Sequence, residues 1–389
     1  MSGVTEKLYD IDSEQFAFDA TVLSCEPHSK GGFAVVLDRT AFFPESGGQY
    51  ADRGTLDGVT VTDVRIKDEC ITHLVEQPLC VGATVRGEID AELRLAKMQC
   101  HTGEHIISGL AHQHYGYENV GFHLGNGEMT MDLDGELSPE QLASLEREAN
   151  EIVWRNVAVR AEYPDAETLR ALAYRSKLDL TEGVRIVTVE GVDACACCAP
   201  HVKRTGEIGI IKIVDAIRYK GGMRLWVLCG RWALEDYKTK HDHILTITRK
   251  HSVKPWQVVE VTEKQTDELM LTRAALSAAR RELADAKLAA ARPDERGDLL
   301  FFESEMDASI QRGMADSGAD RCRGICGVFC ETENGYRYVC VSRQLALREL
   351  GKRLNASCNG RGGGTDAIIQ GTLGATRDQI EAFFQAVER

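Results

Sequence analysis

The chain has 389 residues, of which 43% are hydrophobic and 27% are charged, as is typical of a globular protein with several domains. No apolar run approaches the roughly 18 residues that a membrane-spanning helix needs, and the first residues lack the basic start and apolar stretch of a signal peptide. The net charge of −14 opposes non-specific binding to a polyanion, so a nucleic-acid partner would need a local basic surface. We therefore expect a cytoplasmic protein with neither a membrane nor a DNA partner.

The thirteen cysteines are predicted to be thiols and metal ligands. An odd number in a long chain without a secretion signal argues against a disulfide framework. Two groups stand out, Cys195, Cys197 and Cys198 in one and Cys322, Cys326 and Cys330 in the other. The second group has no evident fourth ligand nearby, so buried thiols are favoured there over a second metal site.

Residues 1–90 are predicted to form a β-rich domain. Gly32–Asp38 is a short apolar strand candidate, and Gly54–Val64 alternates in the manner of another. Between them, the proline and two glycines of Thr40–Asp52 (TAFFPESGGQYAD) mark a turn or an exposed loop.

Residues 91–235 are predicted to form one α+β domain. The pattern becomes helical from Glu92 to about His114. A second helix is predicted at Pro139–Trp154, because Ser138 suits its N-cap and proline suits the first helical position. Short strands are expected at Val157–Tyr163, Val184–Val189, Ile208–Val214 and Arg224–Cys229.

Residues 236–296 are predicted to form a helical spacer. Leu269, Leu276 and Leu283 recur every seven residues in a segment that ends at Pro293. The pattern is typical of a coiled coil, on itself or with a partner chain in a homodimer. It is equally typical of an amphipathic helix against a neighbouring domain.

Residues 297–389 are predicted to form the last unit, with both strands and helices. The expected elements are strands near Gly324–Cys330 and Tyr336–Ser342, helices near Gln344–Asn355 and Arg377–Val387, and a glycine-rich loop between those helices.

The strongest chemical signal is the pair His101 and His105 in HTGEH. Two histidines four residues apart lie on one face of a helix, where both imidazoles can reach one ion. Cys197 and His201 in CCAPH repeat the spacing on a segment that Pro200 makes a turn or a first helical turn. One thiolate and three imidazoles suit zinc, so Zn²⁺ is the predicted cofactor.

Two alternatives remain open for these motifs. Cys195 and Cys198 also offer thiols, although Cys197 gives the C-x3-H spacing. HTGEH also fits the inverted zinc-protease motif H-x-x-E-H, in which Glu104 would be the general base. Gly103, which loosens the helix, and the additional thiolate–imidazole pair argue against a protease.

These segments resemble a known family. HTGEH, CCAPHV, TGEIGIIKIV and GGMRLWVLCG are similar to the zinc editing domain shared by alanyl-tRNA and threonyl-tRNA synthetases. TAFFPESGGQYADRG resembles the glycine-rich motif of the alanyl branch. Asn359–Gly371 (NGRGGGTDAIIQG) resembles the signature of the C-terminal domain of alanyl-tRNA synthetase, a module also appended to DHH phosphoesterases. The motifs occur in family order and cover nearly the whole chain.

The resemblance implies a long-form AlaX protein, a free-standing relative of the editing half of alanyl-tRNA synthetase. Its fold would be α+β and multidomain, with a β-barrel-like N-terminal domain, a zinc editing domain, a helical spacer and an α/β C-terminal domain. The glycine-rich motif starts at residue 40, which leaves no room for an aminoacylation domain. The protein is therefore expected to hydrolyse mischarged Ser-tRNA(Ala), and often Gly-tRNA(Ala), without charging tRNA. A non-catalytic tRNA-binding protein is the remaining alternative.

The resemblance also implies site residues. The zinc ligands would be His101, His105, Cys197 and His201, and the substrate-binding residues of the glycine-rich motif would be Thr40, Gly47, Gly48 and Gln49. A plain hairpin turn is the alternative for that motif. A polar residue downstream of the first histidine helps the family to discriminate serine, and His123 is the nearest candidate. Glu104 is a candidate catalytic base, a partner of a metal ligand, or a solvent-facing helix carboxylate.

A basic surface is predicted on the C-terminal unit, which the resemblance directs at the corner of tRNA. Between Arg337 and Arg361 there are six basic residues and one acidic residue, Glu349. Exposed backbone N–H groups of a glycine-rich loop can hold a phosphate. This motif departs from the family pattern at Asn359, where a glycine is usual, and at Thr365, which replaces a basic–proline pair. The residues predicted to bind tRNA are Arg343, Arg348, Lys352, Arg353, Arg361, Gly362, Gly363 and Gly364.

Overall fold

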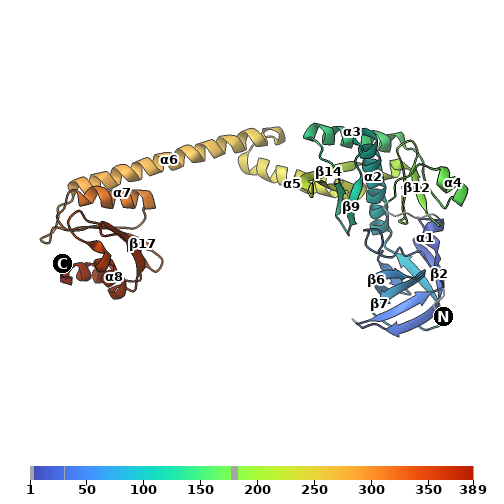
Figure 1. Cartoon of the computed structure of the whole chain (residues 1–389), viewed down its shortest axis with the longest axis horizontal. Helices are drawn as coiled ribbons and strands as arrows, with labels where there is room; N and C mark the ends of the chain where they lie inside the picture. Colours follow the sequence, from blue (N-terminus) through green and yellow to red (C-terminus); the bar gives the residue numbers. More distant parts are fainter. Residues whose placement is uncertain (1–3, 30, 177–182, 389) are drawn as a thin grey trace. The chain divides into compact units, whose positions relative to one another are not determined.

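The computed structural model describes residues 4–29, 31–176 and 183–388. The chain divides into two compact units, Met1–Leu245 and Thr246–Arg389 (Figure 1). The mixture of α and β structure in several parts is as predicted. Of the helices in these described residues, none combines the length and the apolar character that a membrane crossing requires.

The first unit begins with a closed barrel of strands that pair in the order β2-β3-β7-β6-β5-β8. Buried and more exposed side chains alternate along β7 and β8, because successive side chains of a strand point to opposite faces. The strands are β2 (Ala17–Pro27), β3 (Phe33–Leu37), β5 (Gly54–Leu56), β6 (Val59–Lys67), β7 (Cys70–Val75) and β8 (Thr84–Ile89). Three short elements accompany the barrel, β1 (Glu6–Lys7), α1 (Leu8–Ile11) and β4 (Arg39–Thr40).

The single strand predicted at Gly54–Val64 is wrong, because this segment is the hairpin of β5 and β6. Asp57 and Gly58 form its two-residue turn, with φ angles of 47° and 79°. Positive φ at both positions is the geometry of a type I′ turn, whose twist matches that of the flanking antiparallel strands. The Asp-Gly pair was the sequence signal for this turn.

Helix α2 (Ala91–Tyr115) follows the last barrel strand and confirms the first predicted helix. The Asp90 side chain caps its start, and Gly116 ends it in the left-handed conformation. The helix packs on an antiparallel sheet of order β14-β15-β10-β9. These strands are β9 (Asn119–Leu124), β10 (Met129–Leu133), β14 (Ile211–Tyr219) and β15 (Gly222–Cys229).

Helix α3 (Pro139–Arg155) confirms the second predicted helix, and Ser138 and Gln141 form a capping box at its start. The strand predicted at Ile208–Val214 begins three residues late, because the chain first forms the 3-10 helix η1 (Thr205–Ile208). A second sheet has the order β11-β12-β13. Its strands are β11 (Val159–Glu162), β12 (Ile186–Val189) and β13 (Asp193–Ala196), and α4 (Ala166–Ala171) lies between the first two in sequence.

Two buried basic side chains of α2 attach the barrel to the rest of the first unit. The Arg94 Nε–H donates to both carboxylate oxygens of Asp52, at 3.1 and 3.0 Å, and both side chains are almost fully buried. The Lys97 ammonium donates to the carbonyl oxygens of Tyr50 and Ala51. All three acceptors belong to the glycine-rich loop after β4, so this loop is fixed to the helix that carries HTGEH.

The second unit contains a five-stranded sheet of order β16-β17-β18-β20-β19. The helix α5 (Gly230–His251) spans the boundary between the units, and η2 (Pro255–Gln257) follows it. The helices of the second unit are α6 (Val258–Ala290), α7 (Ala308–Ala319), α8 (Leu347–Ser357) and α9 (Arg377–Ala386). The strands are β16 (Leu299–Glu303), β17 (Cys326–Thr332), β18 (Gly335–Val341), β19 (Arg361–Gly364) and β20 (Ile368–Leu373).

The predicted heptad leucines do not pack within the second unit. Leu269, Leu276 and Leu283 are 50%, 50% and 56% exposed. Ala284 and Leu288 of α6 are buried instead, in a core cluster shared with α7. The coiled-coil homodimer stays a prediction.

The predicted glycine-rich loop is wrong in part, because Arg361–Gly364 form the edge strand β19, paired with β20. A Cβ at Gly362 would lie 2.8 Å from the Tyr338 hydroxyl oxygen and 2.3 Å from a backbone carbonyl oxygen of β20. A Cβ at Gly364 would lie 2.0 Å from another carbonyl oxygen of that segment. These glycines permit a close approach of two strands, a packing need that a sequence does not distinguish from a loop.

Candidate metal centre

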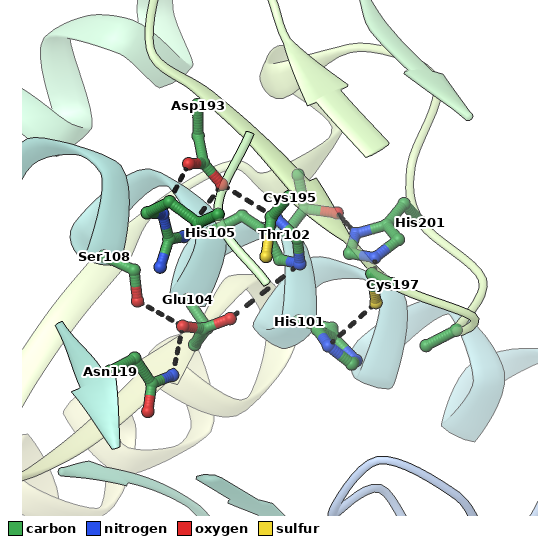
Figure 2. Close-up of polar contacts among 12 residues, drawn as sticks. His101, Thr102, Glu104, His105, Ser108, Asn119, Asp193, Cys195, Cys197 and His201 are labelled. Carbon is green, nitrogen blue, oxygen red and sulfur yellow. Dashed lines mark hydrogen bonds and ion pairs between the residues drawn. The ribbon is translucent and has the colours of Figure 1, made fainter. Parts of the chain in front are cut away.

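Four side chains from two segments meet at one buried point (Figure 2). His101 and His105 come from α2, and Cys197 and His201 come from the loop that follows β13. One ligand atom of each residue lies within 4.8 Å of the others. The histidines are only 5%, 2% and 3% exposed. The structure thus brings together all four of the residues that the spacing singled out.

The inward atoms of the cluster are a thiol and imidazole nitrogens. Cys197 Sγ lies 3.5 Å from His101 Nε2 and 3.3 Å from His201 Nε2. Burial raises the pKa of the Cys197 thiol, but the imidazoles of His101 and His201 outweigh burial, so this pKa lies well below its usual range. Burial lowers the pKa of His201 to about 3, which keeps its ring neutral. Burial lowers the pKa of His105, but the hydrogen bonds to Asp193 and Cys197 outweigh burial and raise this pKa well above its usual value. A thiolate and neutral imidazoles are the forms that bind metals, so His105 would release a proton when a metal binds.

The outward atoms of the imidazoles are held by hydrogen bonds at Nδ1. The distances are 2.7 Å from His101 to Gln49 Oε1, 3.0 Å from His105 to Asp193 Oδ2, and 3.0 Å from His201 to Thr102 Oγ1. Amide and carboxylate oxygens only accept, so His101 and His105 carry a proton on Nδ1 and turn Nε2 toward the centre. Partners of this kind orient metal-binding histidines in proteins.

Asp193 is itself held by Arg175, through two hydrogen bonds of 2.8 and 2.9 Å. Burial opposes the ionisation of Asp193, but the hydrogen bonds from His105 and Arg175 outweigh burial and lower the pKa of Asp193 to about 2. His105 therefore faces a charged acceptor at neutral pH. Sequence reasoning missed Asp193, Arg175 and Thr102; only Thr102, inside HTGEH, gave any signal.

The geometry fits a zinc ion. Two ligands of a tetrahedral zinc ion, a sulfur at about 2.3 Å and a nitrogen at about 2.05 Å, lie about 3.6 Å apart. The sulfur–nitrogen distances of 3.5 and 3.3 Å in the cluster are close to that value. Three imidazoles and one thiolate are also a donor set that zinc prefers.

Glu104 lies beside the cluster and is buried, with 5% exposure. The solvent-facing interpretation of this carboxylate is wrong, because every residue of α2 from Cys100 to Ala111 is buried. Oε1 of Glu104 accepts hydrogen bonds from the Ser108 hydroxyl and, at 2.5 Å, from the Asn119 amide. The other oxygen, Oε2, lies 3.9 Å from His105 Nε2, and so points toward the centre (Figure 2).

The glycine-rich loop reaches the cluster through Gln49. This side chain is fully buried, and its Nε2 finds no hydrogen-bond partner among the described residues. Gly47 and Gly48 have φ angles of 59° and 85°. A Cβ at Gly48 would lie 2.3 Å from the carbonyl oxygen of Phe122 on β9, whereas one at Gly47 would meet open space. The two glycines thus let the loop pass close to β9, and this path places Gln49 in contact with His101.

Thr40 lies inside the barrel and not at the cluster. Its side chain is fully buried, its Oγ1 is 2.8 Å from Nε2 of His73, and it also accepts from the N–H of Phe42. The hydroxyl therefore satisfies buried polar groups at the start of the loop. This geometry does not support contact with a substrate.

His123 also lies apart from the inward atoms of the cluster. Its ring packs edge-on against Tyr50 at 5.0 Å, and its Nε2 is 3.7 Å from a carboxylate oxygen of Glu128. The preceding residue, Phe122, contacts the His101 ring at 4.6 Å. Successive residues of a strand point to opposite faces, so Phe122 turns toward the cluster and His123 turns away.

The basic residues predicted to bind tRNA lie on the second unit, and several are already paired. The contacts are Arg343 with Asp316 and Asp320, Lys352 with Glu349, and Arg353 with the backbone carbonyl of Glu388. Arg348 and Arg361 make no such ion pair within the described part of the chain. Gly362–Gly364 lie in the exposed edge strand β19. Acidic neighbours thus reduce the positive charge over part of this surface.

Two family models match the first unit. The threonyl and alanyl tRNA synthetase second additional domain matches residues 184–225, which contain Cys197 and His201. The class II (A) tRNA synthetase model matches residues 15–93, which form the barrel.

Curated relatives match this chain over different parts of its length. The alanyl-tRNA editing protein Aarsd1 of Mus musculus is 27% identical over 96% of this chain and 96% of its own length. The chain is thus similar, over nearly its whole length, to a protein named as an alanyl-tRNA editing protein. The Aarsd1 protein of Bos taurus is 32% identical, over 59% of this chain and 56% of its own length. The alanine–tRNA ligase of Halobacterium salinarum is 32% identical over 83% of this chain, which spans only 38% of that ligase.

One solved structure also matches part of this chain. The C-Ala domain from Aquifex aeolicus alanyl-tRNA synthetase matches 24% of this chain and 93% of its own, with 16% identity and a TM-score of 0.22.

Proposed function

We propose that this protein hydrolyses the ester bond that joins serine, or glycine, to tRNA(Ala), with a Zn²⁺ ion held by His101, His105, Cys197 and His201. The observation that carries the proposal is the convergence of those four side chains at a buried point that the glycine-rich loop reaches. The similarity to the Aarsd1 relatives, which are named as alanyl-tRNA editing proteins, supports editing as the activity. The reaction would consume one water, break the bond between the acyl carbon and the ribose oxygen, and release the free amino acid and uncharged tRNA.

The residues of the chain would hold the reacting groups in a fixed and nearly dry environment. A bound zinc ion supplies a Lewis acid that polarises a carbonyl or lowers the pKa of a water. Gln49, Thr102 and Asp193 keep the imidazoles in one orientation, so little reorganisation is needed when the ester arrives. The backbone of Gly47 and Gly48, next to Gln49, would meet the 3′ end of the RNA.

The second unit would supply the tRNA-binding surface. Arg348 and Arg361 are its best candidates, because the other predicted residues are engaged by acidic or backbone groups. Replacing both (Arg348→Glu, Arg361→Glu) should weaken tRNA binding and lower the slope of log affinity against log salt concentration. Zinc content should not change. The double replacement Lys264→Glu, Arg273→Glu at exposed sites on α6 is the matched control, because it changes the net charge by the same amount. Equal affinities of the two variants would contradict this surface.

A deacylation assay tests the proposed activity. Purified protein would be incubated with Ser-tRNA(Ala), Gly-tRNA(Ala), Ala-tRNA(Ala) and Thr-tRNA(Thr), and loss of the aminoacyl label would be followed. Rapid loss from the first two, with Ala-tRNA(Ala) spared, is expected. Elemental analysis should give one zinc per chain, and a chelator should stop the reaction.

The same assay separates the alternatives. Binding of charged tRNA without loss of the label would indicate a non-catalytic tRNA-binding protein. Cleavage of peptides, with charged tRNA left intact, would indicate a zinc protease of the H-x-x-E-H type. Attachment of alanine to tRNA(Ala) in the presence of ATP would contradict the absence of a charging activity.

A further inference from the structure

Glu104 has a buried carboxylate, in which one oxygen accepts hydrogen bonds from the protein and the other is directed at the cluster. Ser108 and Asn119 donate to Oε1, while Oε2 lies 3.9 Å from His105 Nε2 (Figure 2). The donor groups come from different elements, Ser108 from the next turn of α2 and Asn119 from the start of β9. Together they fix the plane of the carboxylate, so the direction of Oε2 is built into the fold.

This arrangement differs from that of a purely structural carboxylate. Both donors to Oε1 are neutral, and neither carries a charge that would offset the carboxylate. Each carboxylate oxygen can accept more than one hydrogen bond, so Oε2 retains acceptor capacity on its side facing the centre. A buried charge is costly unless a charged or hydrogen-bonding group meets it. Because Oε2 lies next to the ligand atoms of the cluster, a donor group on a molecule bound at the metal centre would be within its reach.

An α-amino ester has the matching chemistry. Its ammonium nitrogen is two bonds away from the carbonyl carbon. If the carbonyl lies at the cluster, the ammonium group therefore lies beside a side chain that borders the cluster. Glu104 is a carboxylate in that position, because its Oε2 lies 3.9 Å from Nε2 of His105.

We propose that Oε2 of Glu104 binds the free α-ammonium group of the amino acid esterified to tRNA. This inference rests on the proposed function and names its substrate class as aminoacyl esters with an unblocked amino group. Peptidyl and N-formyl esters would be rejected, since an amide nitrogen carries no charge. They are also larger than the aminoacyl group, and the cluster histidines are at most 5% exposed. Ser108 and Asn119 act as positioning residues for the carboxylate.

Binding of a matched pair of analogues tests the proposal. The first is 3′-deoxyadenosine that carries serine through a 3′ amide, which the protein cannot hydrolyse as an ester. The second has a hydroxyl in place of the α-amino group. Calorimetry with the full-length, zinc-loaded protein at pH 7 should show the amino analogue binding about 10- to 100-fold more tightly, as expected for a hydrogen bond to a charged group.

The variant Glu104→Gln should remove this preference, because it keeps the shape and loses the charge. Its zinc content and circular dichroism should match those of the wild type. Glu92→Gln is the matched control, since Glu92 lies on the same helix and is exposed in an ion pair with Arg231. This control should keep the full preference.

Equal binding of the two analogues by the wild type would overturn the proposal, and this comparison needs no variant to fold. A preference that survives in Glu104→Gln would also overturn it, even if that variant deacylates slowly, because Glu104 would then serve the water and not the ammonium group. Preference for the amino analogue by a wild type that deacylates no charged tRNA would refute the proposed function and leave the ammonium site standing.

Discussion

Two regions of the first unit bury histidines, and they do so for different purposes. His73 lies inside the barrel, fully buried, with Nδ1 facing the carbonyl oxygen of Val35 and Nε2 facing the Thr40 hydroxyl. Both of its nitrogens are satisfied within the protein. At the cluster, only the Nδ1 atoms are satisfied from outside, and the Nε2 atoms of His101 and His201 lie against Cys197 Sγ.

The difference shows which property of a buried histidine indicates a metal site. Burial alone does not, since His73 is as buried as any histidine of the cluster. The informative property is a combination of two contacts. A hydrogen-bond partner holds Nδ1 on the side away from the cluster, and Nε2 faces a thiolate, so the Nε2 lone pairs and the sulfur point at one place. Variants on either side of the comparison should therefore respond in different ways.

The largest effect is expected for Cys197→Ser. A serine hydroxyl does not replace a thiolate as a zinc ligand, so the protein should lose its zinc. The deacylation rate should fall more than about 100-fold, which exceeds the effect of losing a residue that only orients a ligand. Cys198→Ser is the adjacent control and should retain both properties. Full zinc occupancy in Cys197→Ser would show that the Cys197 thiol is not needed to hold the ion.

His73 should make the stability of the barrel depend on pH. Burial lowers the pKa of His73 to about 4 from its usual 6.5. Between those values the unfolded chain takes up a proton that the folded chain does not. Stability is therefore complete above pH 6.5 and is lost as the pH falls toward 4, by about 3 kcal/mol. Urea unfolding of the wild type and of His73→Gln should show a flatter pH profile in the variant; parallel profiles would contradict the assignment.

An outer partner should have a smaller effect than a ligand. Asp193→Asn removes the charge behind His105 and leaves Arg175 without its carboxylate, so zinc affinity should fall about 10- to 100-fold in competition with a chelator. Asp215→Asn, at an exposed position of β14, should leave the affinity unchanged. An unchanged affinity in Asp193→Asn would mean that His105 needs no orienting partner.

The smallest effect is expected for alanine at the paired glycines. Both Gly47→Ala and Gly48→Ala place a side chain at positive φ, at a cost of about 1 to 2 kcal/mol. Only the Gly48 variant also collides with the Phe122 carbonyl, so it alone should displace Gln49 and slow deacylation, by about tenfold. Equal rates in the two variants would show that the loop does not position Gln49.

The parts of the site that the sequence predicts are those set by local geometry. The spacing of His101 and His105 on a helix, and of Cys197 and His201 on a loop, depends only on residues four apart. The Ser138 cap and the limits of α2 and α3 are local in the same sense.

The contacts that sequence reasoning missed join residues that lie far apart in the chain. Gln49 reaches His101 over 52 residues and Asp193 reaches His105 over 88, so no spacing rule connects them. The prediction of a loop at the glycines of β19 is wrong for a related reason. Their small size serves contact with Tyr338 and β20, and a sequence does not show which strand lies beside another.

The buried pair of Arg94 and Asp52 has a consequence for how this protein can be divided. A fragment that begins at α2 would lose every group to which the Arg94 guanidinium donates, because Asp52, Ser13 and Ala41 all precede the helix. It would also expose the surface of α2 that the barrel and its loop cover. The same cut would remove the amide behind His101. The barrel and the histidine-bearing helix α2 therefore form one structural unit. Replacing either of them by a domain from another protein would require changing the residues on both sides of their contact.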